Sequence, residues 1–163
     1  MADSVRFSQS HGILGLTVDG DWNAGFDSDS IDMAKYNHAT ILIEGDANVA
    51  GAAVLTLYGG ATAGAKTAAV TFGYRYPSAA IGSANSDVYG AVATSAALTS
   101  TPASIASRVM VIEFDAADLY ISGVQYRYAT LEVSAAGTAG TCDIIAILSE
   151  PRYAEAIMDT AQA

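Results

Sequence analysis

The sequence predicts an all-β protein, an antiparallel β-sandwich or jelly roll of about eight strands with one short helical turn. Apolar residues recur with a period of two, which is typical of strands with one face in a core. β-branched and aromatic residues are concentrated in the same runs. No segment has the length and 3.6-residue period of a crossover helix, so a parallel sheet is not expected.

Six runs show the alternation clearly: residues 38–44, 53–58, 67–76, 108–115, 126–133 and 141–149. Two weaker candidates, residues 12–19 and 87–94, bring the number of strands to about eight. In residues 141–149 the second face is mostly apolar as well. Residues 115–119 are expected to form the helical turn, with Asp115 as its N-cap.

The chain of 163 residues is expected to form one domain with two terminal extensions. Residues 1–34 are interpreted as an N-terminal arm and acidic loop with room for one strand, residues 35–150 as the β-sandwich, and residues 151–163 as a C-terminal tail. Residues 78–107 contain one acid and no base. Long structureless loops are uncommon in compact domains, so this segment predicts a hidden strand or a projecting arm.

Composition restricts the partners of the chain. Hydrophobic residues make up 52% of it, which excludes disorder throughout, and the net charge is −10. An acidic chain is a poor ligand for nucleic acid or for an anionic membrane. The charged N-terminus has no apolar segment after it, so no signal peptide is expected. The single cysteine, Cys142, is expected to be a buried free thiol in a protein made in a reducing cytoplasm.

Catalytic residues are scarce, and we expect no enzyme. Nucleophilic catalysis needs a base beside the nucleophile, and the chain offers only His11 and His38, without a supporting local motif. Glu44, Glu113 and Glu132 lie on separate predicted strands and could meet as a carboxylate pair, as in a glycosidase. Acids at strand ends are more often simply solvated.

Residues 59–67 are a candidate phosphate site. Residues 59–67 look like a phosphate-binding loop, but Ala65 occupies the position of the required glycine and a strand pattern follows. We therefore expect a small-residue hairpin loop and no cofactor.

The acidic loop is a weak candidate for a metal site. Residues 19–23 begin like an EF-hand loop, but Ala24 and Ser30 replace its glycine and its glutamate. A different loop built from Asp27, Asp29 and Asp32 could hold Ca²⁺. The alternative is a solvated acidic loop, and no metal is expected.

Two tyrosine–arginine–tyrosine triplets, residues 74–76 and 126–128, lie on predicted strands. They indicate either packing of arginine on aromatic rings or a protein interface, because tyrosine and arginine often anchor such contacts.

Five blocks carry a family resemblance: KYNHATILIE (35–44), TFGYR (71–75), VIEFDAADL (111–119), YRYATLE (126–132) and AILSEPRY (146–153). Their order and spacing resemble the small β-sandwich head decoration, or cement, proteins of tailed bacteriophages. The resemblance implies a non-enzymatic virion protein, made in the bacterial cytoplasm, that lies on the capsid exterior and bridges neighbouring major capsid subunits. It implies no cofactor, and we expect a homo-oligomer, a trimer rather than a dimer.

The terminal segments are expected to contact the capsid, because chain ends can reach a neighbour and become ordered there. The candidate contact residues are Trp22 and Phe26 in the arm and Arg152 and Tyr153 in the tail. The alternative function is a jelly-roll module of a phage or bacterial surface structure that binds a receptor or a glycan. It would need exposed aromatic residues beside acids.

Overall fold

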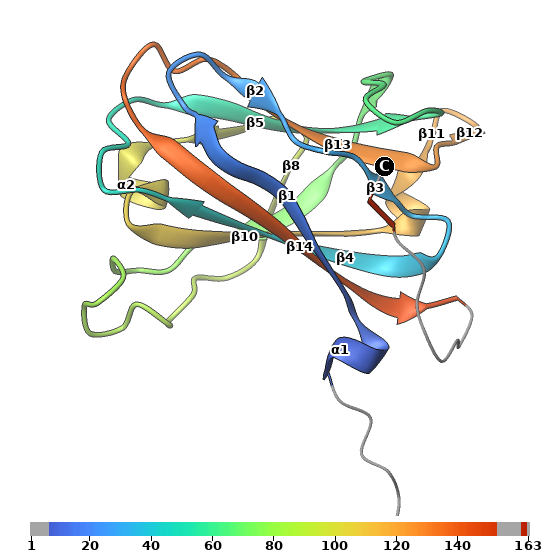
Figure 1. The fold of residues 1–163 in the computed structure, drawn as a ribbon, viewed down its shortest axis with the longest axis horizontal. Coiled ribbons are helices and arrows are strands. Elements are labelled where there is room, and N and C mark those ends of the chain that lie inside the picture. The colour runs from blue at the N-terminus through green and yellow to red at the C-terminus, as the bar shows by residue number, and fades with distance from the viewer. Residues whose placement is uncertain (1–6, 153–160, 163) are drawn as a thin grey trace, which may run out of the picture.

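The computed structural model describes residues 7–152 and 161–162 and confirms an all-β antiparallel sandwich (Figure 1). Sheet A has the order β1 (Gly12–Asp21), β14 (Thr141–Pro151), β4 (Tyr36–Gly45), β10 (Arg108–Asp115), β7 (Phe72–Arg75) and β8 (Ala93–Ser95). Sheet B has the order β2 (Phe26–Asp27), β13 (Tyr128–Val133), β5 (Ala53–Gly60) and β6 (Ala68–Ala69), with β3 (Ile31–Asp32) on β13 and β9 (Leu98–Ser100) on β5. A separate hairpin joins β11 (Tyr120–Ile121) to β12 (Val124–Gln125).

The core lies between the inner faces of the two sheets. Alternate residues of β4, β10 and β14 point into it, and so do Leu55 and Leu57 of β5, which are fully buried. Fully burying a side chain of this size contributes about 1.5–3 kcal/mol. The period of two in the sequence is therefore explained by strands that each bury one face.

The predicted strand over residues 67–76 is two strands in different sheets. β6 pairs with β5 in sheet B, and β7 pairs with β10 in sheet A. Between them Val70 is fully buried, and its N–H donates to the carbonyl of Leu57 over 2.8 Å. The alternation of apolar residues continues where the chain passes from sheet B to sheet A, because β6 and β7 face the same core.

Residues 78–107 contain both features that the sequence left open. β8 and β9 supply strands, and residues 77–92, here called the arm, project beside β10 (Figure 1). The arm is fastened by hydrogen bonds from Ile81 N–H to the Ser107 carbonyl (2.7 Å) and from the Tyr89 hydroxyl to the Val109 carbonyl (3.1 Å). The strand expected over residues 87–94 is present only from Ala93 to Ser95.

The N-terminal segment belongs to the sandwich from Gly12 onward. β1 pairs with β14 along most of its length, and β2 and β3 pair with β13. The chain end also returns to the sandwich, since Ala161 is buried and its carbonyl accepts a 2.7 Å hydrogen bond from Asp32 N–H. At residues 12–32 and 161–162 the structure thus differs from the N-terminal arm and C-terminal tail that the sequence predicted.

The expected helical turn is present as the 3-10 helix η1 (Ala116–Leu119), where the Asp118 carboxylate accepts a 2.7 Å bond from Asp115 N–H. Two further turns, α1 (Phe7–Ser10) and α2 (Pro102–Ile105), were not predicted. Over the residues that the structure describes, no helix is long and apolar enough to cross a membrane.

Candidate functional site

The predicted contact residues do not form one exposed surface. Trp22 is fully buried, and its indole Nε1–H donates to the carbonyl of Gly51 over 3.0 Å. Phe26 is partly buried and packs against the core. Trp22 is therefore a core residue here, contrary to the expectation that it contacts a partner. Arg152 is exposed, whereas Tyr153 lies outside the described residues.

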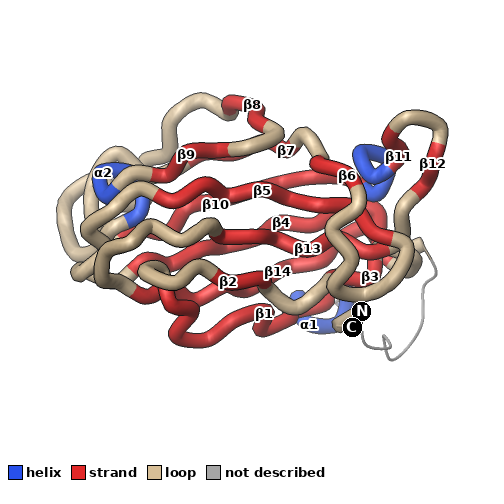
Figure 2. Tube along the Cα trace, turned by 90° about the horizontal axis from the view of Figure 1, so that it is seen from above, coloured by secondary structure: helices blue, strands red, loops and turns tan. Residues whose placement is uncertain are grey.

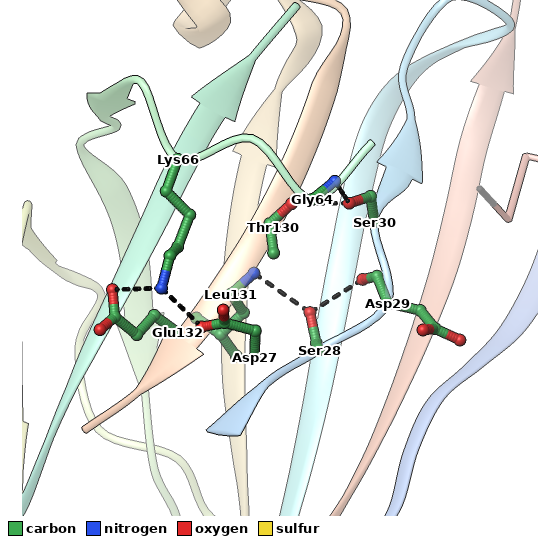
Figure 3. Close-up of polar contacts among 9 residues, drawn as sticks. All are labelled: Asp27, Ser28, Asp29, Ser30, Gly64, Lys66, Thr130, Leu131 and Glu132. Carbon is green, nitrogen blue, oxygen red and sulfur yellow. Dashed lines mark hydrogen bonds and ion pairs between the residues drawn. The ribbon is translucent and has the colours of Figure 1, made fainter. Parts of the chain in front are cut away.

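The three candidate calcium ligands each have a partner of their own. Asp27 accepts from Lys66 Nζ at 2.9 Å and Asp32 from Arg127 Nε at 2.9 Å, while Asp29 accepts from the Gln162 amide at 2.8 Å. Figure 3 shows the carboxylates of Asp27 and Asp29 pointing away from each other. Among the described residues no group of three or more potential ligands could hold a metal ion.

In the loop of residues 59–67, which resembles a phosphate-binding loop, Gly64 and Lys66 donate hydrogen bonds to other parts of the protein. The N–H of Gly64 donates to Ser30 Oγ (2.8 Å), and Ser30 Oγ lies 2.7 Å from Thr130 Oγ1 (Figure 3). Lys66 bonds Asp27 and lies 3.4 Å from Glu132, and the hydrogen bond with Asp27 raises the pKa of Lys66. The loop is thereby fastened to the outer side of sheet B.

The three glutamates considered as a catalytic pair do not converge. Glu132 lies on the outer side of sheet B beside Lys66, whereas Glu44 and Glu113 belong to sheet A. Glu113 faces Arg75 at 3.8 Å.

The histidines and the cysteine are also apart. His38 Nδ1 lies 2.7 Å from Asp115 on the exposed side of sheet A, and the His11 ring stacks on Phe7. Cys142 points into the core at the other end of β14, and burial raises the pKa of its thiol to about 12.

The outer side of sheet A carries an unusual apolar surface. We call it the sheet A face and define it by Ile13, Leu42, Val111, Ile145 and Ile147. In the ladder Leu42 lies opposite both Ile145 and Val111, and Ile147 lies opposite Ile13. The two rows are joined along β14, where Ile145 and Ile147 are successive residues of the same face. Ile13 is 57% exposed and Ile145 is 43% exposed.

The arm limits this surface on one side. The ring of Tyr89 lies 5.6 Å from the guanidinium of Arg75, and Arg75 is the ladder neighbour of Val111. Val111 is therefore only 8% exposed, whereas the side chains toward β1 are open. The sheet A face is therefore covered near the arm, at Val111, and exposed toward β1, at Ile13 and Ile145.

Acidic residues border the sheet A face at one end. Glu44 and Asp143 are exposed and lie directly opposite each other on β4 and β14. The Asp143 carboxylate also accepts a 2.8 Å hydrogen bond from Asp19 N–H. Like charges opposite each other destabilise a sheet, so a cationic group of a partner would relieve this repulsion.

The outer side of sheet B differs in character. It presents Thr56, Tyr58 and Glu132, while Thr130 on the same side is buried, and the loop of Gly64 and Lys66 is fastened across it. Sequence reasoning found the second apolar face of residues 141–149. It missed Ile13, Leu42 and Val111, because only the strand register brings them beside Ile145.

Fold and site together define an antiparallel β-sandwich with exposed apolar side chains on the outer side of sheet A. The fold is similar to that of the SPBc2 prophage-derived protein YomS, whose crystal structure superimposes with a TM-score of 0.52 and 9% sequence identity over 85% of this chain and 91% of that chain. At this identity the likeness concerns the fold alone. No protein-family model and no curated protein matches the sequence.

Proposed function

We propose that this chain is a structural virion protein of a tailed bacteriophage, which decorates the capsid exterior and stabilises it by bridging neighbouring major capsid subunits. The observation that carries the proposal is the sheet A face, whose apolar side chains lie on β1, β14, β4 and β10 and are most exposed at Ile13 and Ile145. A protein that clamps a shell needs apolar area and shape complementarity, multiplied over many copies.

The occupant of the sheet A face is a capsid subunit with an apolar surface flanked by basic residues. Glu44 and Asp143 at the border favour a cationic partner. A second copy of a chain with a net charge of −10 is a poorer fit, because its own acids would approach this border.

The sequence resemblance to head decoration proteins supports a phage origin, and the fold shared with a prophage-derived protein is in keeping with it. On this proposal the chain is made in the host cytoplasm, carries no cofactor and assembles as a homotrimer before or during capsid binding.

The alternative, a jelly-roll module that binds a receptor or a glycan, has less support. Such a module would use Trp22 or Phe26 beside calcium-binding acids, but Trp22 is buried and Asp27, Asp29 and Asp32 are individually paired. Melting that depends on calcium would favour this alternative.

The proposal is tested by co-sedimentation of the purified chain with undecorated heads of the phage that encodes it. We expect saturable binding at micromolar protein. Ile145→Asn should weaken binding about tenfold or more, because it removes an exposed apolar contact from the centre of the sheet A face.

The matched control is Thr56→Asn on the outer side of sheet B, which should bind like the unmodified chain. Both variants change exposed or half-exposed side chains, so melting temperatures verify that they fold. Absence of binding at micromolar protein, or equal binding by the two variants, would contradict the proposal.

A further inference from the structure

Sheet A has two edge strands, β1 and β8, and β1 is protected against pairing with a further strand. An edge strand leaves alternate N–H and C=O groups unpaired, which makes it a template for another strand. Along β1, two register shifts interrupt the ladder with β14. The carbonyls of Gly15 and Leu16 also accept hydrogen bonds, from the Gln162 side chain (3.2 Å) and from Asp29 N–H (3.1 Å). β1 is therefore closed to a further strand.

β8, which lies at the margin of the sandwich in Figure 2, differs from β1. Within the described part of the chain, residues 91–96 form no backbone–backbone hydrogen bond outside the ladder with β7. Val92, Ala93 and Thr94 are all exposed. Residues 88–107 contain no charged residue, although charges on an edge strand are a common way to keep other strands away. β8 is therefore the open edge of sheet A.

A hollow of about 290 Å³ adjoins this edge, and its walls include Tyr74, Tyr76, Ala91 and Ala93. Tyr74 and Ala93 are opposite each other in the ladder, so their side chains lie on the same side of sheet A. Tyr74 is partly buried against the core, whereas Tyr76 is 43% exposed. Because an alanine side chain ends at Cβ, space remains beside the two tyrosines. The hollow can therefore hold an apolar side chain of a partner.

Val92 and Thr94 lie on the opposite side of β8 from Ala93. Thr94 is opposite Gly73 in the ladder, and a Cβ atom added to Gly73 would lie 3.3 Å from Val92 Cγ1. Successive side chains of a strand point to opposite faces. A strand added at β8 with apolar residues at alternate positions would thus place them on the side of the hollow, and its other side chains beside Val92 and Thr94.

From the open edge and the adjoining hollow we propose that β8 binds an extended segment of another protein, which joins sheet A as a further strand and inserts an apolar side chain beside Tyr74 and Tyr76. The segment is uncharged, because it can then be buried along an uncharged edge without the desolvation of an ion. In this binding mode, backbone hydrogen bonds give affinity and pockets for alternate side chains give specificity. β8 has three residues, so the side chain in the hollow has to contribute much of the affinity.

This edge lies beyond β7 from the sheet A face, and its use does not depend on capsid binding. The test is binding of a synthetic peptide to the full chain, followed by NMR. The probe is an uncharged peptide with blocked ends, in which threonine alternates with valine and phenylalanine, so that its apolar side chains share one side. We expect saturable binding, with shifts concentrated in the amide signals of residues 72–76 and 90–95. A control peptide of the same composition, with its apolar residues adjacent to one another, should not bind.

Variants of β8 separate the hollow from the rest of the strand. Ala93→Phe should weaken peptide binding about tenfold or more, because the added ring occupies the hollow. Ala91→Phe fills the hollow from another wall and should have the same effect. Thr94→Phe adds a ring on the opposite side of β8, so it is the matched control and should bind like the unmodified chain. All three positions are exposed, and melting temperatures verify that the variants fold.

No saturable binding of the alternating peptide, or equal binding by Ala93→Phe and Thr94→Phe, would overturn the inference. Shifts of the amide signals of residues 91–95 that grow with protein concentration alone would also overturn it, because a second copy would then occupy the edge. The peptide assay contains no phage heads, so its failure is distinguishable from failure of the decoration function.

Discussion

At the scale of single residues, the ion pair of Asp32 and Arg127 joins parts of the chain that are distant in sequence. The Asp32 side chain is 10% exposed, whereas the Arg127 side chain is 55% exposed. Asp32 also accepts a 2.9 Å hydrogen bond from Ala34 N–H. The hydrogen bond from Arg127 holds the pKa of Asp32 below its ordinary value of 3.8, although burial opposes this shift.

Asp32→Asn should lower the free energy of unfolding at neutral pH by about 1–3 kcal/mol, a range that allows for the solvent screening of Arg127. Because the folded-state pKa of Asp32 is depressed, its contribution is fully present above pH 3.8 and is lost as the pH falls through the folded-state value. Denaturant unfolding at neutral pH and near pH 3 measures both effects. The control is Asp27→Asn, whose more exposed pair with Lys66 should cost about 1 kcal/mol or less. Equal losses for the two variants would contradict this account.

Cys142 gives a second test at this scale. Its side chain is buried in the core and its thiol pKa is raised to about 12, so the reactive thiolate is scarce near neutral pH. We expect a thiol reagent to label Cys142 only when denaturant unfolds the chain. Rapid labelling of the folded chain would show that this part of the core is open.

At the scale of elements, the loop that carries Gly64 depends on one buried hydroxyl. Ser30 is 2% exposed and contacts both Gly64 N–H and the hydroxyl of Thr130. Ser30→Ala should cost about 1–3 kcal/mol, because it removes the partner of the buried Thr130 hydroxyl and the acceptor of the Gly64 N–H. Ser83→Ala in the arm, where the side chain is exposed, is the control and should change stability by about 0.5 kcal/mol or less. Equilibrium unfolding in urea measures both.

The returning C-terminus is a second element with a testable role. Ala161 is buried against the sandwich, and the Gln162 amide donates to the Gly15 carbonyl (3.2 Å) and to Asp29 (2.8 Å). Deleting residues 161–163 should therefore lower the melting temperature by several degrees, at about 2–4 °C for each kcal/mol lost. If the melting temperature stayed unchanged while head binding fell, these residues would be a capsid-binding tail, as the sequence suggested.

Much of this architecture follows from local pattern. The alternation in residues 108–115 and 141–149 predicts β10 and β14 because a strand turns each successive side chain to the opposite face. Asp115 and Asp118 predict η1 because acids stabilise the start of a helix. Both features depend only on neighbours in the sequence.

Other features depend on contacts that local pattern does not contain. Trp22 lies in an aspartate-rich segment and was expected to contact a partner, but its indole N–H donates to the Gly51 carbonyl, which allows the side chain to be buried. The sheet A face requires the pairing of β1 with β14, two strands at opposite ends of the chain. Its apolar row therefore becomes visible only when the register is known.

At the scale of the whole molecule, the two outer sides of the sandwich have different chemistry. The sheet A face is apolar with an acidic border, and the outer side of sheet B is polar and partly covered by the loop of Gly64 and Lys66. On the proposed function, the sheet A face meets the capsid and the outer side of sheet B meets solvent.

The proposed decoration function requires the sheet A face to meet the capsid shell. Electron cryomicroscopy of phage heads incubated with the purified chain tests this claim most directly. The predicted result is regular density on the head exterior, oriented with β1, β14 and β4 against the capsid subunits and sheet B toward solvent. Heads without added density, or density in which sheet B faces the shell, would contradict it.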